Sequence, residues 1–228
     1  MKSRVHDEVA LESRWEAAPA VAIVIVLQAI TATLSRVGGW ELAGLSWGVW
    51  LIPVVPECAL LVPLAASRHK RTVTQDGERR TMVIQFLAAT GFVNAGVLVA
   101  LIASLLQGDA ASGGELLVKA GTVWITNVVT FGLWFWIFDG GGPARRRIDL
   151  HRPRDMQFPQ MENPTLAAPG WHPHLVDYIY VSFTNAIAFS PTDVMPLSRT
   201  AKMLMMFESV ISALTVLLVA ARAVNIFR

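Results

Sequence analysis

Long apolar stretches with almost no charge constrain this chain more than any other feature of its sequence. A helix needs about 20 apolar residues, at a rise of 1.5 Å per residue, to cross the hydrocarbon layer of a membrane. Four stretches meet that length easily, a fifth is short and more polar, and a sixth is long and ends in arginine. We expect spans at 17–34, 42–66, 82–106, 116–138, 175–190 and 197–227.

The composition agrees with a membrane protein. Of the 228 residues, 54% are hydrophobic and only 16% are charged, whereas soluble domains carry about 25% charged residues. The net charge of +2 argues against a nucleic-acid partner, and the single cysteine, Cys58, excludes an internal disulfide framework. We predict an all-α, polytopic transmembrane helix bundle of about six spans, with the lipid bilayer as its surroundings.

The basic residues predict an orientation. If all six stretches cross, 15 of the 19 lysines and arginines lie on one side. Basic residues mark cytoplasmic loops, so we expect a multi-pass protein of the bacterial inner membrane with both termini in the cytoplasm. The predicted units are a cytoplasmic N-terminal segment (1–16), four transmembrane helices (17–138), a cytoplasmic connector rich in Arg, Gly and Pro (139–174) and a channel-like C-terminal helix pair (175–228).

The connector carries few signs of chemistry. The glycines at 140–142 are not followed by the Gly-Lys-Ser/Thr of a phosphate-binding loop. Its candidate ligands His151, Asp155, His172 and His174 match no common zinc spacing. With no pairing of nucleophile and base either, we expect no catalytic residues, no metal and no cofactor, and we do not expect an enzyme.

Glu57 is the most suggestive charge inside a predicted span. It lies among Pro53, Pro56 and Pro63, and proline removes a backbone donor and disturbs a helix. We therefore expect the second span to be kinked or unwound near Glu57. Broken helices with a carboxylate form ion or proton sites in transporters. The alternatives are a structural ion pair with Lys119 or a protonated carboxyl group.

Two polar stripes follow the period of a helix. The fourth span carries Lys119, Thr122, Thr126 and Thr130, with Asn127 beside them, and the sixth carries Glu208, Ser212, Thr215 and Arg222. Such stripes line either a water-filled path or a contact between helices that share hydrogen bonds. For serine and threonine alone the contact is favoured, while Glu208 leaves the two interpretations equal.

The last fifty residues resemble the pore loop and inner helix of tetrameric potassium-type channels. In that family a short helix beginning Asp-Tyr-x-Tyr leads to a Thr-Val-Gly-Tyr-Gly-Asp filter, a proline and the inner helix. Asp177, Tyr178 and Tyr180 match the start of the pore helix, and Asp193 and Pro196 match the end of the filter. The resemblance implies an oligomer with an ion path near Thr184, Asn185, Ser190, Thr192 and Asp193.

The filter itself departs from that family, because residues 188–192 read Ala-Phe-Ser-Pro-Thr. Successive carbonyls of a potassium filter require glycines in left-handed conformations, so we do not expect potassium selectivity. A loop that re-enters from outside would also put ten basic residues on the wrong side, so we expect 175–190 to span. The Ser190-Pro191 step predicts a turn, and we expect Ser198 to cap the last helix.

Residues 80–227 also resemble a family of functionally uncharacterised bacterial multi-spanning inner-membrane proteins. The shared features are an aromatic fourth span (Leu133 to Trp136), a Gly-Gly-Pro-x-Arg turn at 141–145, Phe-Pro at 158–159, and Asp-Tyr-x-Tyr followed by Ser-x-Thr-Asp. This resemblance implies the location of the protein and no activity.

Two functions remain open at this point. The first is a channel-like or transporter-like protein, expected to be a homo-oligomer, that moves an ion or small solute past Glu208, Ser212 and Thr215. The second is a non-conducting membrane protein that binds a partner or lipid through its Arg-rich connector.

Overall fold

The computed structural model describes residues 17–65, 73–107, 112–149, 151–190 and 193–226. The predicted N-terminal segment 1–16 therefore lies outside the described residues. The main elements are the helices α1 (Ala17–Gly38), α2 (Val54–Ala65), α3 (Val73–Leu106), α4 (Gly113–Phe138), α7 (Leu175–Ala188) and α8 (Arg199–Ile226). Short elements connect them: the 3-10 turns η2 (Trp47–Leu51), η3 (Asp139–Gly141) and η4 (Pro164–Leu166), the helices α5 (Pro143–Ile148) and α6 (Pro159–Glu162), and the strands β1 (Met156–Gln157) and β2 (Met195–Pro196).

The all-α prediction is confirmed, but six spans are not. Four helices in the described part of the chain are long and apolar enough to cross a membrane: α1, residues 80–106 of α3, α4 together with η3, and residues 199–222 of α8. These features are compatible with an integral membrane protein. The remaining two predicted spans, 42–66 and 175–190, form shorter helices.

The second predicted span is broken, as the prolines indicated, but the break precedes Glu57. The chain turns at 40–46, forms η2, and begins α2 at Val54, directly after Pro53. Pro56 lies in the first turn of α2, where a missing backbone N–H costs no intrahelical hydrogen bond. Glu57 N donates to Pro53 O (3.3 Å), so Glu57 belongs to a regular helical turn.

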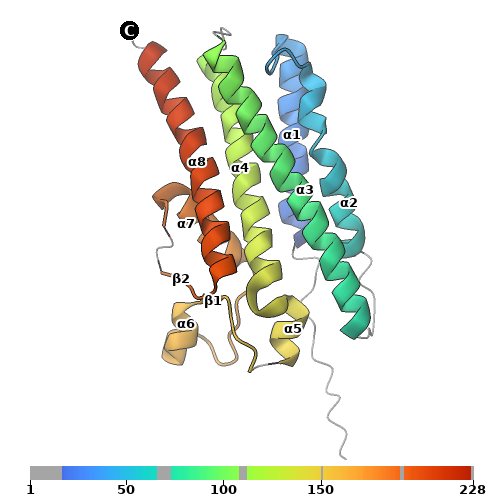
Figure 1. Ribbon diagram of the computed structural model, residues 1–228, viewed down its shortest axis with the longest axis vertical. Coiled ribbons are helices and arrows are strands. Elements are labelled where there is room, and N and C mark those ends of the chain that lie inside the picture. The colour runs from blue at the N-terminus through green and yellow to red at the C-terminus, as the bar shows by residue number, and fades with distance from the viewer. Residues whose placement is uncertain (1–16, 66–72, 108–111, 150, 191–192, 227–228) are drawn as a thin grey trace, which may run out of the picture.

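The helix α4 forms the centre of the bundle (Figure 1). It packs against α1 and α3 on one side and against α7 and α8 on the other. Its N-terminus is capped by Ser112, whose hydroxyl accepts a hydrogen bond from Glu115 N (3.1 Å). Because α4 is surrounded by other helices, its polar stripe faces protein rather than lipid.

The helix α7 enters the bundle and the chain then returns to the end from which it came (Figure 1). Its 14 residues rise only about 21 Å, less than the roughly 30 Å of a hydrocarbon core. Antiparallel pairing joins Met156 of the connector to Pro196 after α7, and Leu197 N donates to Asp155 O (2.8 Å). The chain therefore returns to the connector after α7, contrary to the spanning helix that we expected.

This return changes the direction of α8. The helix begins beside the connector and ends at the opposite end of the bundle (Figure 1). Six crossings would have required the reverse direction. Arg199 and Lys202 lie in the first turn of α8, on the connector's side. The predicted cap is confirmed, because Ser198 Oγ accepts a hydrogen bond from Ala201 N (3.1 Å).

Candidate functional site

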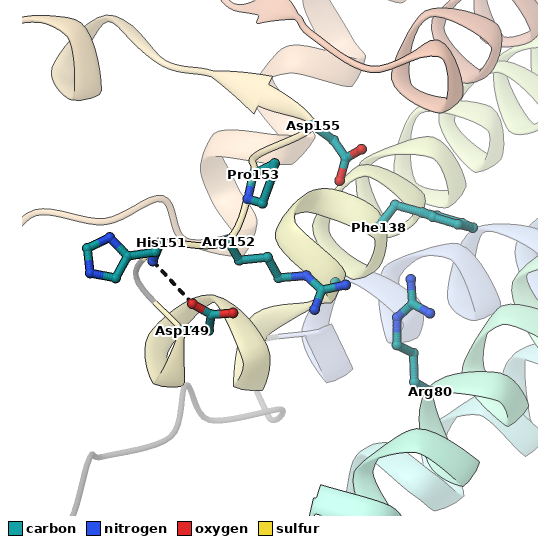
Figure 2. Close-up of a pocket in the computed structure, with 8 residues that line it drawn as sticks. Arg80, Phe138, Asp149, His151, Arg152, Pro153 and Asp155 are labelled. Carbon is teal, nitrogen blue, oxygen red and sulfur yellow. Dashed lines mark hydrogen bonds between the residues drawn. The ribbon is translucent and has the colours of Figure 1, made fainter.

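An open pocket of about 570 Å³ lies at the connector end of the bundle. Figure 2 shows that it is walled by α3, the end of α4 and the connector. Its lining residues are Arg80, Phe138, Gly141, Asp149, His151, Arg152, Pro153 and Asp155. The pocket thus combines two arginines with two carboxylates at the point where the longest helices end.

The two arginines come from distant parts of the sequence. Arg80, on α3, donates from Nε to Ile137 O (3.3 Å) and holds its guanidinium 5.3 Å from the centre of the Phe138 ring. Arg152 lies against Gly141, where an added Cβ would come within 2.9 Å of Arg152 Nε. Gly141 has a φ of 83°, a conformation that favours glycine. The glycine-rich turn therefore leaves room for the second arginine.

Asp139 organises this end of the bundle. It is buried, and its Oδ1 accepts hydrogen bonds from Asp155 N (2.8 Å) and Met156 N (3.1 Å). Its Oδ2 accepts from the Tyr178 hydroxyl (2.6 Å) and lies 3.7 Å from Arg154 Nη1. Since these partners are all donors or cations, Asp139 acts as a carboxylate that ties α4, the connector and α7 together.

Tyr178 completes the Asp139 cluster. Burial raises the pKa of its hydroxyl well above its ordinary value, so the group keeps the proton that it donates to Asp139. The Arg146 guanidinium lies 5.1 Å from the centre of the Tyr178 ring, and Phe158 meets the same ring edge-on at 5.3 Å. The sequence analysis noted Tyr178 and Phe158 within resembling motifs but missed Asp139. The available signal was its position, since it is an acidic residue directly between the aromatic fourth span and the glycine-rich turn.

A second polar cluster surrounds Glu208 in the interior of the bundle. Glu208 is fully buried, and its Oε2 accepts a hydrogen bond from Asn185 Nδ2 (2.7 Å). Its Oε1 is hydrogen-bonded to Ser182 Oγ. One turn further along α8, Ser212 Oγ accepts from Asn127 Nδ2 (3.0 Å). The structure thus brings together the predicted residues Asn185, Glu208 and Ser212, joining α4, α7 and α8.

The donors in this cluster can be counted. Ser182 Oγ donates to Val128 O (2.7 Å) and is also bonded to Glu208 Oε1. A hydroxyl group carries one hydrogen, so both bonds form together only if Glu208 supplies the second. The arrangement therefore fits a neutral, protonated Glu208 whose two oxygens both have partners.

Glu57 lies in a different environment on the other side of α4. Its side chain is 2% exposed, and Oε1 accepts a hydrogen bond from Gln28 Nε2 (2.8 Å). Its Oε2 has no hydrogen-bond partner within the described parts of the chain. It borders a small cavity of about 10 Å³, lined also by Thr90 and Thr130 and otherwise by Val and Leu side chains.

The proposed ion pair between Glu57 and Lys119 is wrong. Lys119 is buried and instead pairs with Glu115, and its Nζ donates to Glu41 O (2.6 Å). Lower on the same stripe of α4, Thr122 and Thr31 share a hydrogen bond of 2.7 Å. The stripe therefore makes contacts between helices, the alternative that the threonines favoured.

The remaining pore candidates are not gathered at one point. Thr184 donates to its own helix at Val181 O (3.0 Å), and Thr215 likewise donates to Ile211 O (2.8 Å). Ser190 and Asp193 are exposed, and Thr192 lies outside the described residues. The segment after α7 thus forms an outer corner of the chain, which begins where Phe189 adopts a φ of 55°.

The connector histidines do not converge with acids. The rings of His172 and His174 lie 4.5 Å apart, and His174 N donates to Asp177 Oδ2 (2.7 Å) to cap α7. Within the described ranges, no three His, Cys, Asp or Glu side chains are placed to hold a metal ion.

No protein-family model, no curated protein and no solved structure matched the chain. The described residues form a helical protein with four apolar helices of membrane-crossing length, a half-length helix beside them and an arginine pocket at one end.

Proposed function

We propose that this chain is an integral membrane protein that binds the phosphate group of an anionic lipid in the pocket of Arg80 and Arg152. The observation that carries the proposal is the convergence of two guanidinium groups, from α3 and from the connector, on one open pocket at the end of the bundle. The planar guanidinium group of arginine binds phosphate through two parallel hydrogen bonds.

The two carboxylates of the pocket are hydrogen-bonded to backbone groups rather than to its arginines. Asp155 Oδ2 accepts from Gly140 N (3.0 Å), and Asp149 Oδ1 accepts from His151 N (3.2 Å). Both acids are thus engaged by backbone groups. Neither Arg80 nor Arg152 is ion-paired with a carboxylate in the portion of the chain that the structure describes. Two neighbouring cations repel each other, and a bound phosphate would relieve that repulsion.

The position of the pocket supports a lipid as the source of the phosphate. Arg80 is the first residue of an apolar segment long enough to cross a membrane, so the pocket would lie at the level of the lipid head groups. Basic pockets beside transmembrane helices recognise anionic head groups on the cytoplasmic side. The positive-inside rule then puts the connector in the cytoplasm, and our sequence prediction of a bacterial inner membrane fits this location.

Thermal unfolding in lipid nanodiscs tests the proposal. We expect the midpoint of unfolding to be a few degrees higher in nanodiscs containing phosphatidylglycerol than in phosphatidylcholine alone, because a ligand that binds only the folded state stabilises it. Arg152→Gln should remove most of this difference. Arg199 is exposed at the same end of the bundle but lies outside the pocket. Arg199→Gln is therefore the matched control and should keep the difference between the two kinds of nanodisc.

Three outcomes would count against the proposal. An equal shift in the two variants would show general attraction of the basic surface to anionic lipid. No shift in the unmodified protein would show that the pocket binds no such lipid. A shift caused by soluble glycerol phosphate in phosphatidylcholine nanodiscs, and not by phosphatidylglycerol, would assign the pocket to a soluble compound.

A second candidate function is the movement of an ion or small solute by a homo-oligomer. The observation that favours it is the helix α7, which is too short to span and returns to its own side, as half-helices of channels and transporters do. Flux of monovalent ions into liposomes that contain the purified protein is the test. Flux that Asp193→Ala reduces would support this function, and absence of flux would exclude it.

A further inference from the structure

The pair formed by Glu57 and Gln28 lacks one hydrogen. Gln28 Nε2 donates to Glu57 Oε1 (2.8 Å), while Gln28 Oε1 and Glu57 Oε2 both lack a partner among the described residues. Both side chains are at most 2% exposed. A buried polar atom without a partner costs about 1–3 kcal/mol, and more if it is charged, so this pair needs an explanation.

A proton on Glu57 satisfies both atoms. An amide oxygen and an ionised carboxylate oxygen only accept hydrogen bonds, so they cannot serve each other. A carboxylic acid carries one donor, and an acid and an amide can form two parallel hydrogen bonds. With the proton on Oε2, Glu57 donates toward Gln28 Oε1 while still accepting from Gln28 Nε2, and no buried charge remains.

A small cavity beside Glu57 can hold a water molecule that accepts this proton. Glu57 lines a space of about 10 Å³ together with Thr90, whose hydroxyl also lacks a partner within the described ranges. A single water molecule needs roughly 10–15 Å³ and two or more polar partners. The carboxyl group and the Thr90 hydroxyl supply those partners. The cavity therefore suits one water molecule in contact with the acid.

The charged side chains that the structure describes on the surrounding helices are engaged elsewhere. On α1, Arg36 stacks on Trp47 (5.3 Å); on α3, Arg80 stacks on Phe138; on α4, Lys119 pairs with Glu115. The turn η2 carries no charge, and the lining of the cavity has no titratable group besides Glu57. Glu57 therefore has no counter-ion within the described structure, and its charge depends on its own proton.

We propose that Glu57 is an exchangeable proton-binding site inside the bundle. In the loaded state the carboxylic acid is paired with Gln28. On release, the O–H bond of the carboxyl group breaks and the proton passes to the water molecule in the cavity, which hands a proton on to the solvent. The carboxylate then accepts from Gln28 Nε2 and from that water molecule, whose oxygen accepts from the Thr90 hydroxyl. This site is separate from the lipid pocket, and either assignment can fail without the other.

Infrared difference spectroscopy of the protein in nanodiscs, titrated with acid and alkali, tests this site. Glu57→Gln should abolish a C=O stretching band of a protonated carboxyl group that disappears as the pH rises. Glu208→Gln is the matched control and should leave that band in place. A titrating band that survives Glu57→Gln, or one that responds to sodium but not to pH, would overturn the assignment.

Two further variants keep the test decisive if Glu57→Gln does not fold. Gln28→Met and Thr90→Val each remove one hydrogen-bonding partner proposed for the acid or its water. Each should shift the frequency or the titration midpoint of the band, whereas Thr33→Val, at an exposed threonine of α1, should not. A band that is the same in Gln28→Met, Thr90→Val and the unmodified protein would refute the site.

Discussion

Glu57 and Glu208, the two glutamates buried in the described part of the chain, lie on opposite sides of α4 and differ in how fully their oxygens are paired. Glu208 has partners on both oxygens, from Ser182 and Asn185. Glu57 has one partner, Gln28, and a second oxygen that borders a cavity. A fully paired acid fixes the packing of three helices, whereas a partly paired acid beside a cavity can exchange its proton. Burial alone would not separate the two, because both are almost inaccessible to solvent.

The largest loss of stability is expected from replacing Asp139, a third buried acid. Both of its carboxylate oxygens accept hydrogen bonds from N–H or O–H groups, so it fits an ionised acid, whereas the partners of Glu208 fit a neutral one. Asp139→Asn would turn an amide N–H toward those donors and should lower the free energy of unfolding by about 3 kcal/mol. Denaturant unfolding in detergent micelles measures this. Glu208→Gln is the comparison and should cost less than about 1 kcal/mol, because glutamine mimics the protonated acid.

Replacing Glu208 by leucine should have the next largest effect. Glu208→Leu leaves Asn185 Nδ2 and Ser182 Oγ each with one partner fewer in a closely packed interior, and we expect a loss of about 2 kcal/mol in the free energy of unfolding. The same unfolding experiment reports it. If Glu208→Leu were as stable as the unmodified protein, the cluster would not hold α4, α7 and α8 together.

The corresponding change at Glu57 should cost much less when Gln28 is replaced with it. Glu57→Leu combined with Gln28→Leu removes the hydrogen bond together with both oxygens that lack a partner, and the cavity is lined mainly by valine and leucine. Because replacing both members of a buried polar pair by apolar groups is nearly neutral, we expect a change within about 1 kcal/mol in the free energy of unfolding. Equal losses for this double variant and for Glu208→Leu would break the comparison on which this distinction rests.

The smallest expected effect distinguishes two threonines one turn apart on α4. Thr126 Oγ1 has no partner among the described residues, whereas Thr122 and Thr31 share a hydrogen bond. Thr126→Val should therefore leave stability unchanged or raise it by about 0.5 kcal/mol, and Thr122→Val should lower it by about 0.6 kcal/mol. Thermal unfolding of the two variants side by side measures the difference. The reverse order would contradict the assignment of partners.

The sequence predicts the long helices well, because their apolar runs are continuous. The structure confirms long helices near 17–34, 82–106, 116–138 and 197–227, and each is apolar enough to cross a membrane. It does not confirm a single helix at 42–66 or 175–190. The prolines divide the first of these into η2 and α2, and a short apolar run such as 175–190 has the same composition whether it crosses a membrane or enters and returns. Only the pairing of Met156 with Pro196, across forty positions of sequence, decides the path of α7.

The sites were predicted in part. Periodicity placed Glu208 and Ser212 on one face of α8, and α4 supplied Asn127 opposite them. The pairing of Glu57 with Gln28 and the role of Asp139 could not be predicted, because each depends on which helices are neighbours. The arginine pocket could not be predicted either. In the sequence, Arg80 and Arg152 indicate only the orientation in the membrane, and only the fold brings them together.

The resemblance to potassium-type channels remains a prediction. Asp177, which begins the matching motif, caps α7 through its hydrogen bond with His174 N, and Tyr178 bonds to Asp139. These contacts give the motif a structural role within one chain. An ion path near Asp193 would need neighbouring copies of the chain, and the flux experiment bears on that function.

The most direct test of the proposed function is the lipid that the protein retains when it is extracted from a membrane. Native mass spectrometry in a mild detergent counts the phospholipids bound to each chain. We predict that the unmodified protein and Arg199→Gln retain an anionic phospholipid and that Arg152→Gln loses it. Equal retention by all three proteins, or no retained phospholipid on any of them, would contradict the assignment of the pocket to a lipid phosphate.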